Sequence, residues 1–424
     1  MRDLLVARGQ LDWSAQPCGY HGIDALSHLE LGRLRDYLVA VDKGDLAGQD
    51  DLRVLTALRL LTPAGELTYA GLLLLGRQDA LRQLLPGHGY SFQYRPSSGS
   101  EATSRVREEQ PVLAGIERML GLVEAHAAFR PLNISGGIQL QLVDYPQNAV
   151  RELVVNAFLH RSYETHGTVD VEHSPEALIV TSPGGFLPGI TPDNVLSYPS
   201  TPRNRLLTEV FSMLRLAERT GQGVDRAFRE LLRVGKEPPT FTDLGTSVRA
   251  VVRGGIGDDA FVGYVSTLPA QAGRDVEILL TLSYLRTRQS VDAVTLARVV
   301  QRPAPESQEV LARMVALELV ETTRRTAGRP LPTYRLRPAA LAGLGRAVRY
   351  HRQGPAQTDE KVLEHVREYG YVTNRTLQRM FDVTMFGARD MLADLRRRGV
   401  LCKIGDAHGG TGVRYGPGDA FPRR

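Results

Sequence analysis

The stretch from Tyr145 to Tyr163, YPQNAVRELVVNAFLHRSY, is the one around which the rest of the chain is organised. At helical spacing it places Glu152, Asn156 and His160 on one face, at steps of four residues. Most of the intervening residues are apolar, so the stretch predicts a largely buried helix with one polar stripe. Burying a carboxylate, an amide and an imidazole is costly unless they are paired or used, which makes this stripe the first candidate site.

The composition is that of an ordinary globular protein with several domains. The chain has 424 residues, of which 42% are hydrophobic and 23% charged, enough for roughly two to four domains. Its apolar runs, such as AGLLLLG at 70–76, are too short to span a bilayer, and the N-terminus has no apolar signal region. Cys18 and Cys402 form neither a metal-type spacing nor a disulfide framework. We therefore expect a cytoplasmic protein without a membrane partner.

The net charge of +5 is distributed unevenly along the chain. Residues 274–424 contain 26 Lys or Arg and 16 Asp or Glu, a balance of +10. Subtracting these from the totals of 52 and 47 leaves 26 basic and 31 acidic residues in 1–273, a balance of −5. A basic third joined to an acidic remainder indicates a polyanion-binding end and favours double-stranded DNA as a partner.

The pattern on both sides of the opening stretch predicts an α+β domain over residues 112–256. A helix at 112–127 and the strand IQLQLVDYP precede it, and VDVEHS and ALIVTSP after it predict a β-hairpin. A loop rich in Gly and Pro follows at 182–194, then a helix at 204–216, a second helix after RTGQGVD, and one or two strands in FTDLGTSVRAVVRG. This order is typical of an α/β sandwich with helices on one face of a mixed sheet.

Residues 1–111 predict a helical and mixed module in front of that domain. It contains an amphipathic helix at 29–41 with Ser27 as N-cap, a second helix, a turn at 63–65 and a buried helix capped by Thr68. YSFQYR is interpreted as a strand and the following SSGSEATSRVREE, residues 97–109, as a polar loop. Such a module serves either as a scaffold or as a dimerisation surface, and we expect a homodimer.

The basic end of the chain repeats one pattern twice. After a linker at 257–273, three helical segments and a basic turn between two strands occupy 274–338. A second linker covers 339–357, and the same order recurs over 358–418, with Thr373 and Thr384 where helix N-caps belong. Units of three helices and a wing are winged helix-turn-helix domains, which bind DNA through the third helix and the wing. They also serve as protein-interaction modules.

Most of the candidate DNA contacts lie on the third helices and the wings, and Asn374 and Arg375 lie on the second helical segment of the second unit. In the first unit the third helix is expected over 307–321, where Glu309, Glu318 and Glu321 favour a protein contact instead. Base contacts are expected from Gln308, Arg313, Asn374, Arg375 and Arg389. The basic residues expected to contact phosphates are Arg324, Arg325, Arg329, Arg396, Arg397, Arg398, Lys403 and Arg414.

The central domain carries residue types that suit a nucleotide. Glu152 and Asn156 offer oxygen ligands for a divalent ion, and the glycine segments 183–185 and 221–223 offer backbone amides for phosphates. The P-loop pattern GxxxxGK[ST] is absent, as is GxGxxG after a strand. Each glycine segment is also compatible with a plain turn, and Glu152 with a cap or a pair with Arg151 or Arg161.

Taken in order, ELVVNAFLHRSY, IVTSPGGFLPGIT, ERTGQGVDRAF and LGTSVRAVV resemble the divergent GHKL (Bergerat) ATPase domain of ATP-binding transcriptional regulators often called RecG-like. The resemblance covers about residues 1–260 and implies a site for ATP and Mg²⁺. It implies that Asn156 is the metal ligand and Glu152 the candidate general base. The other nucleotide-binding residues that it implies are His160, Arg161, Ser182, Gly184, Gly185, Gly189, Gly221, Gly223 and Thr246.

This chain differs from the family pattern at three points. Ser162 stands where the branch often has Asp, and Ser182-Pro-Gly-Gly stands where the superfamily has Asp-x-Gly-x-Gly. Many relatives begin with a Schlafen-like, AlbA-type domain, most of which we expect this chain to lack. The resemblance implies a DNA-binding regulator modulated by a nucleotide, with weak ATPase activity as an open question. The alternatives are a DNA-dependent ATPase in repair, remodelling or phage defence, and an adaptor that needs no nucleotide.

Overall fold

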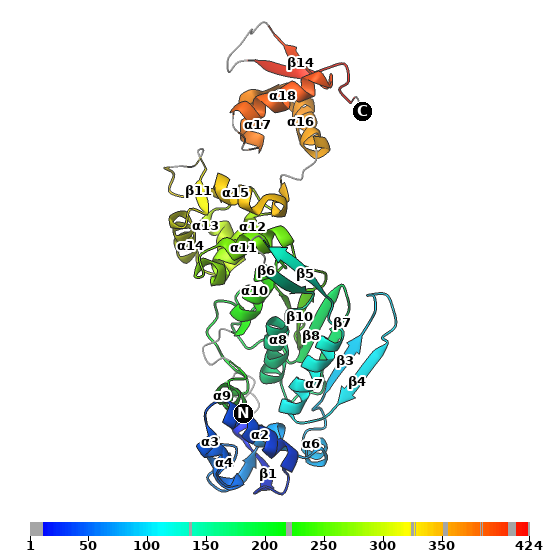
Figure 1. Ribbon diagram of the computed structural model, residues 1–424, viewed down its shortest axis with the longest axis vertical. Helices are drawn as coiled ribbons and strands as arrows, with labels where there is room; N and C mark the ends of the chain where they lie inside the picture. The colour runs from blue at the N-terminus through cyan, green and yellow to red at the C-terminus, as the bar shows by residue number, and fades with distance from the viewer. Residues whose placement is uncertain are drawn as a thin grey trace.

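The computed structural model describes residues 12–134, 138–217, 223–323, 326, 328–350, 355–381, 383, 385–405 and 413–422. Buried side chains in these residues form three hydrophobic clusters. The first joins the N-terminal module to a central sheet, the second lies in the first C-terminal helical unit, and the third lies in the last unit. Figure 1 shows these parts following one another along the long axis of the molecule.

The N-terminal module packs helices around a small two-stranded sheet. Strand β1 (Pro17–His21) pairs antiparallel with β2 (Glu66–Thr68). The Thr68 hydroxyl accepts a hydrogen bond from the Gly71 amide, which confirms the predicted cap, whereas Ser27 makes no side-chain cap bond. The helices of the module are η1 (Trp13–Ala15), α2 (His28–Ala40), α3 (Gly44–Ala47), α4 (Asp51–Ala57), α5 (Tyr69–Leu75) and α6 (Gln78–Leu84).

A six-stranded mixed sheet lies at the centre of the fold, with strand order β4-β3-β7-β8-β10-β9. The β3–β7 pair is parallel and the other pairs are antiparallel. The β7–β8 pair confirms the hairpin predicted from VDVEHS and ALIVTSP. The strands are β3 (Tyr90–Tyr94), β4 (Ser104–Glu108), β7 (Val169–His173), β8 (Ala177–Pro183), β9 (Thr240–Asp243) and β10 (Ser247–Arg253).

The sheet extends across the boundary that we placed between residues 111 and 112, because β3 and β4 precede that point. The prediction of a polar loop at 97–109 is wrong for residues 104–108, which form β4. β4 is an edge strand whose side chains are exposed or half-buried, so its polar composition resembled that of a loop. The strand predicted from IQLQLVDYP is β6 (Ile138–Val143), which pairs with β5 (Phe129–Ile134) outside the main sheet.

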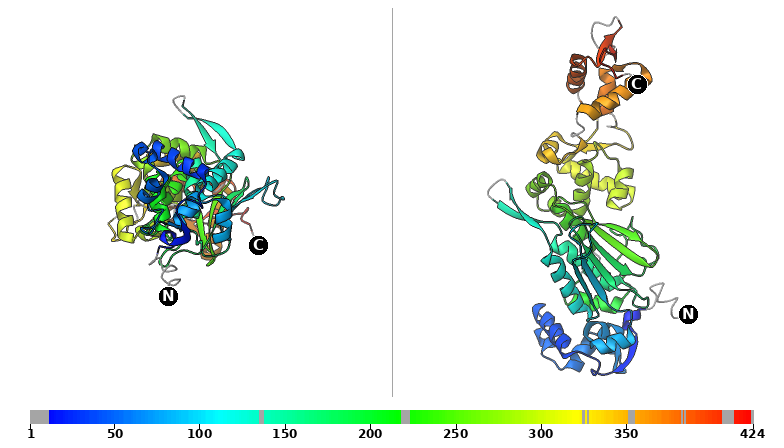
Figure 2. Two further views of the ribbon diagram at one scale, coloured as in Figure 1. Left: turned by 90° about the horizontal axis from the view of Figure 1, so that it is seen from below. Right: turned by 90° about the vertical axis from the view of Figure 1, so that its right-hand side faces the viewer.

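Helices cover one face of the sheet, as predicted (Figure 2, right). The opening stretch forms α8 (Gln147–His160), which lies against β8 between α7 (Val112–Ala125) and α10 (Gly223–Arg233). Along β7, Val169 and Val171 are fully buried under these helices, while Asp170 and Glu172 on the other face are half-buried. The remaining helix of this part, α9 (Arg205–Met213), contacts the N-terminal η1.

Two helical units with a similar order of elements follow the sheet. In both, three helices precede an antiparallel pair of strands, and in the second unit a further short strand between the first two helices joins that pair. The first unit contains α12 (Val276–Leu285), α13 (Ala293–Val300), α14 (Ala304–Ala316), β11 (Val320–Thr322), β12 (Tyr334–Leu336), α15 (Pro338–Leu344) and η3 (Gly345–Ala347). The second contains α16 (Pro355–Tyr369), β13 (Val372–Thr373), α17 (Asn374–Phe381), α18 (Met385–Arg397), β14 (Leu401–Ile404) and β15 (Arg414–Pro417).

Three details of these units differ from the sequence-based expectations. The segment 257–273 contains helix α11 (Asp259–Thr267), whose Phe261 is fully buried in the second cluster, so it is part of that core. The segment 339–357 likewise contains most of α15 and η3. The third helix spans 304–316 instead of 307–321, because proline is tolerated in a first turn and the left-handed Glu318 (φ 58°) ends the helix. Glu321 consequently lies in β11.

The described residues contain no helix with the length and apolar composition that crossing a membrane requires.

Candidate functional site

A cavity of about 180 Å³ lies between α8, the inner face of β8 and β10, and the loop that joins β8 to α9. Its walls are mainly apolar and include Leu153, Val180 and Phe241. The loop, residues 184–203, forms much of the outer wall, and we call it the covering loop. An apolar slot with a few polar groups at one end is the usual form of a small-molecule site.

The polar stripe of α8 faces this cavity, since Glu152, Asn156 and His160 all line it. The Glu152 side chain is almost fully buried, and its carboxylate accepts a hydrogen bond from the Arg226 guanidinium of α10 at 3.0 Å. The structure thus gives Glu152 a partner on α10, where the sequence had suggested Arg151 or Arg161. The reason is tertiary, because α10 packs directly along α8.

Gly223, the first residue of α10, permits this close approach. A Cβ at this position would lie 2.7 Å from Glu152 Oε2 and 3.7 Å from Asn156 Nδ2. Any larger residue would therefore have to displace the carboxylate. The amide end of α10 faces the polar end of the cavity, where negative charge is stabilised. Gly221 lies outside the described residues.

His160 is held as a neutral imidazole next to a structural arginine. Burial, together with the positive charge of Arg203, lowers the pKa of His160 to about 4. Arg203 donates to the His160 carbonyl at 3.0 Å and to the Gly185 carbonyl at 2.6 Å. It therefore fastens the start of the covering loop to the end of α8. The sequence reasoning missed Arg203, which belongs to no motif and is distinguished only by preceding a helix.

Three of the predicted residues form the entrance of the covering loop and line the cavity. The Ser182 hydroxyl donates to the Ala157 carbonyl at 2.7 Å, which anchors β8 to α8. Gly184 has a φ of 93° and donates its amide to the Thr246 carbonyl at 2.8 Å. A Cβ on Gly185 would lie 2.6 Å from the Gly245 carbonyl oxygen. Both glycines are needed for the loop to cross the β9–β10 turn.

Three other predicted residues do not line the cavity. Arg161 is buried in the core, where its guanidinium donates to the carbonyls of Gly87, Gly89 and Gly167, so its role is structural. Gly189 lies further along the covering loop, beside Tyr198. Thr246 was expected on a strand but lies exposed in the β9–β10 turn, because β10 begins at Ser247.

The oxygen donors at the cavity suit a metal ion that is bound together with phosphates. Among the described residues, no group of three or more His, Cys, Asp or Glu could hold a metal by itself. Mg²⁺ is commonly held by one or two protein oxygens, with phosphate and water oxygens completing its shell. Asn156, with Glu152 one turn away, fits that kind of site.

In the first C-terminal unit, two of the residues expected to contact DNA, Arg313 and Gln308, are engaged within the protein. Arg313 forms ion pairs with Asp275 at 3.2 Å and with Glu277 at 2.6 Å. Gln308 donates to the Tyr334 hydroxyl at 2.6 Å. Arg329 is exposed in the segment between β11 and β12. Arg324 and Arg325 lie outside the described residues.

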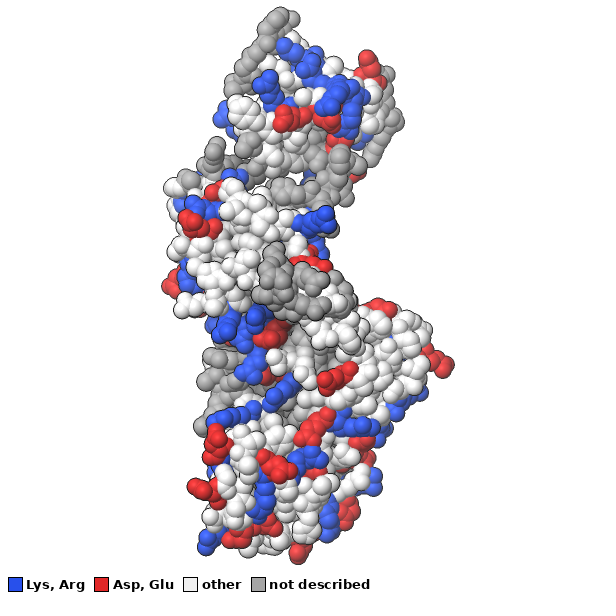
Figure 3. Space-filling view, in the orientation of Figure 1, with Lys and Arg blue, Asp and Glu red and all other residues white. Residues whose placement is uncertain are grey.

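In the second unit the basic side chains expected to contact DNA are exposed, and Figure 3 shows basic residues gathered on this unit. Asn374 is half-buried and braces α17 against α18 through the Met385 carbonyl at 3.1 Å. Of the basic residues, Arg397 pairs with Asp394, Arg398 pairs with Asp359 and Asp394, and Arg414 lies over the Tyr371 ring. Those with no ion pair to another described residue are Arg375, Arg389, Arg396 and Lys403.

Comparisons with known proteins support an ATPase-like domain. The family model described as "Putative ATP-dependent DNA helicase recG C-terminal" matches residues 166–252, and a domain family of unknown function matches residues 5–89. No curated protein matches the chain. The crystal structure of the DIP2311 protein from Corynebacterium diphtheriae shares the fold with a TM-score of 0.68 and 23% identity, over 81% of this chain and 67% of that one.

The match to the ATPase family contains the covering loop and the start of α10, whereas α8 precedes it. Ser182, Gly184, Gly185 and Gly223 therefore lie within the matched segment, and Glu152 and Asn156 lie outside it. The chain carries an ATPase-like domain related to this family, which suggests that it binds a nucleotide.

Proposed function

We propose that this protein is a DNA-binding transcriptional regulator whose cavity binds ATP, or a similar nucleotide, together with Mg²⁺. One observation carries the proposal. Glu152 and Asn156 line one cavity together with Gly184, Gly185 and Gly223, which lie within the ATPase-family match. Neither the helix nor the glycine segments would be specific alone.

Each part of the cavity has a role in this proposal. The Asn156 amide oxygen binds Mg²⁺, which when bound neutralises phosphate charge. The first turn of α10, which begins at Gly223 on the wall of the cavity, binds the phosphates through its backbone amides. The apolar wall formed by Val180, Leu187 and Phe241 accepts the base. Glu152 is held against Arg226, so nucleotide binding does not depend on it.

The C-terminal units supply the DNA-binding half of the proposal. Their shared order of three helices and a small sheet supports the interpretation as winged helix-turn-helix domains. In a homodimer, nucleotide occupancy would alter the relative position of the two pairs of units and hence the spacing of DNA half-sites.

Calorimetric titration of the full chain with Mg·ATP tests the nucleotide half. We expect Asn156→Ala to weaken binding at least about tenfold, the effect of removing one charge-assisted contact. Asn148→Ala is the matched control, because Asn148 is an exposed amide on the same helix that does not line the cavity. Equal losses in both variants would contradict the proposed site.

Footprinting and turnover measurements separate the regulator from the alternative, a DNA-dependent ATPase. The regulator predicts sequence-specific footprints that shift with Mg·ATP, in the wild type and in Glu152→Ala, but not in Asn156→Ala. DNA-stimulated ATP turnover that Glu152→Ala abolishes would support the ATPase instead. Uniform binding to all duplexes would count against regulation of particular genes.

A further inference from the structure

The covering loop is held in one compact shape by Asn194. Its side-chain oxygen accepts from the Thr191 amide at 2.7 Å, and its side-chain nitrogen donates to the Gly189 carbonyl at 2.8 Å. Its own carbonyl accepts from the amides of Ser197 at 3.0 Å and Tyr198 at 2.8 Å. The middle of the loop is therefore braced by its own hydrogen bonds.

This braced segment is fastened from outside by Gln301, a residue of the first C-terminal unit. The Leu196 amide donates to Gln301 Oε1 at 2.9 Å, and Gln301 Nε2 donates to the Pro192 carbonyl at 3.1 Å. Gln301 forms the corner between α13 and α14 in the left-handed region, with a φ of 55°. A residue other than glycine in that conformation costs about 1–2 kcal/mol. Gln301 at this corner thus combines a strained backbone conformation with a side chain that contacts the covering loop.

The wall of the cavity and the core of the first unit are continuous. Val195, Val224 and Phe241 line the cavity and also pack against the second hydrophobic cluster. Helix α10 contributes Phe228 and Leu232 to that cluster. A change in the cavity that moves the covering loop or α10 therefore acts on the first unit through packed side chains.

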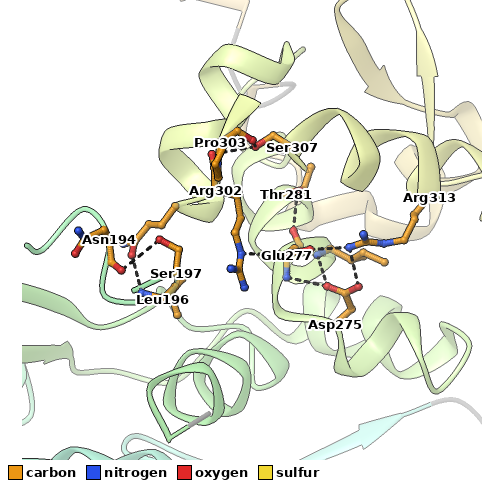
Figure 4. Close-up of polar contacts among 12 residues, drawn as sticks. Asn194, Leu196, Ser197, Asp275, Glu277, Thr281, Arg302, Pro303, Ser307 and Arg313 are labelled. Atoms are coloured by element: carbon orange, nitrogen blue, oxygen red, sulfur yellow. Dashed lines mark hydrogen bonds and ion pairs between the residues drawn. The ribbon is translucent and has the colours of Figure 1, made fainter. Parts of the chain in front are cut away.

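The corner at Gln301 is in turn locked to the third helix, α14. Arg302, the next residue, donates to Glu277 at 3.1 Å, and the same carboxylate binds Arg313 of α14 at 2.6 Å (Figure 4). Asp275, which caps α12, also binds Arg313, at 3.2 Å. These partly buried ion pairs hold the corner, α12 and α14 together as one body.

From this arrangement we infer that Gln301 is a positioning residue for the nucleotide cavity, so that the first C-terminal unit completes the site and responds to its occupancy. The inference rests on the proposed binding of a nucleotide there. With the Gln301 side chain in place, the covering loop is held closed. A nucleotide that favours the closed loop also favours one position of α14, and linkage makes the effect reciprocal.

The test compares Gln301→Gly with the wild type in the full chain. Glycine suits a φ of 55°, so this substitution removes both side-chain hydrogen bonds without straining the corner. Hydrogen–deuterium exchange of peptides covering 189–198 should become about tenfold faster, and Mg·ATP binding about tenfold weaker, with little change in melting temperature. Glu318→Gly is the matched control, because Glu318 is another left-handed residue of the same unit and, among the described residues, its side chain has only a surface ion pair with Arg337.

Each outcome decides the inference. Unchanged exchange of the covering loop in Gln301→Gly, or the same acceleration in Glu318→Gly, would overturn it. Faster exchange with unchanged Mg·ATP affinity would also overturn it, because the loop would then be closed without serving the site. If the wild type does not bind Mg·ATP, the proposed function itself is wrong. If the wild type binds Mg·ATP and Gln301→Gly binds it equally well, only the inference about Gln301 is wrong.

Discussion

The two C-terminal units share three helices followed by an antiparallel pair of strands, but they are attached differently to the rest of the chain. The first shares a hydrophobic cluster with α10, and its Gln301, Arg302 and Arg313 are bonded within the protein. The second has its own small cluster, and Gln289 reaches it with one long hydrogen bond to the Phe381 carbonyl, at 3.4 Å. On the proposals made above, the two units divide the work: the first responds to the cavity, and the second presents basic side chains to DNA.

The largest expected effect is on the free energy of unfolding of the second and third hydrophobic clusters. Leu279 and Leu392 are buried in the second and third clusters, respectively. Leu279→Ala and Leu392→Ala should each cost about 2–5 kcal/mol of unfolding free energy. In calorimetry combined with hydrogen exchange, Leu279→Ala should loosen α10 as well as its own unit, whereas Leu392→Ala should loosen only α16–α18. If the amides of α10 stayed protected from hydrogen exchange in Leu279→Ala, the first unit would not share a core with α10 in the way described.

The next effect is a pH dependence of the central domain, to which His160 on α8 contributes as well as His88 and His173 at the sheet. Burial lowers the pKa of both His88 and His173 to about 4, against roughly 6.5 in an unfolded chain. Between those values the unfolded chain binds more protons, so stability is full above pH 6.5 and falls as the pH drops towards 4. The loss from pH 7 to pH 5 should be about 1–2 kcal/mol per histidine. It should appear in exchange of the sheet and not of α16–α18, where the structure describes no buried histidine.

A third prediction concerns DNA, on the proposal that the second unit is the main contact. Replacing Arg375, Arg389 and Lys403 by Ala should weaken duplex binding about tenfold or more and reduce the salt slope by roughly 3. These residues have no ion pairs with described residues, so stability should change little. Arg313→Ala, in the first unit, should leave the slope unaltered in fluorescence titrations. An equal change in the salt slope of both variants would contradict the proposal that the second unit is the main DNA contact.

The smallest effect distinguishes two arginines, each of which forms two ion pairs. Arg313→Ala and Arg398→Ala each remove a partly exposed arginine that bridges two carboxylates. Each should cost about 0.2–1 kcal/mol. Only Arg313→Ala should also speed hydrogen exchange in the covering loop, because Arg313 shares Glu277 with the corner that carries Gln301. Identical hydrogen exchange of the covering loop in the two variants would show that the ion pairs of Arg313 do not stabilise the loop.

Features that depend on neighbouring residues were predictable from the sequence. The buried α8 with its polar stripe and the β7–β8 hairpin both follow from short-range periodicity, and both are confirmed. The ATPase-like character followed from the order of the motifs, and the family match supports it. The roles proposed for Glu152 and Asn156 in binding and catalysis stay predictions.

Features that depend on distant contacts were missed for a physical reason. The parallel pair of β3 and β7 joins segments about 80 residues apart in the chain. Strand β4, which pairs with β3 on its other side, has the composition of a loop. Arg226, Arg203 and Gln301 acquire their importance only from packing. The length of α14 was misjudged because a left-handed conformation at Glu318 is not encoded by a glycine.

The parallel pairing of β3 with β7 also determines which fragments of the chain can fold on their own and in what order the sheet forms. During synthesis, residues 90–108 emerge well before β7, so the hairpin of β3 and β4 must wait for its neighbour. A fragment that begins at residue 112 would leave one backbone edge of β7 unpaired, which is a template for self-association. Such a fragment should aggregate, whereas one that retains residues 90–108 keeps β7 covered on both sides.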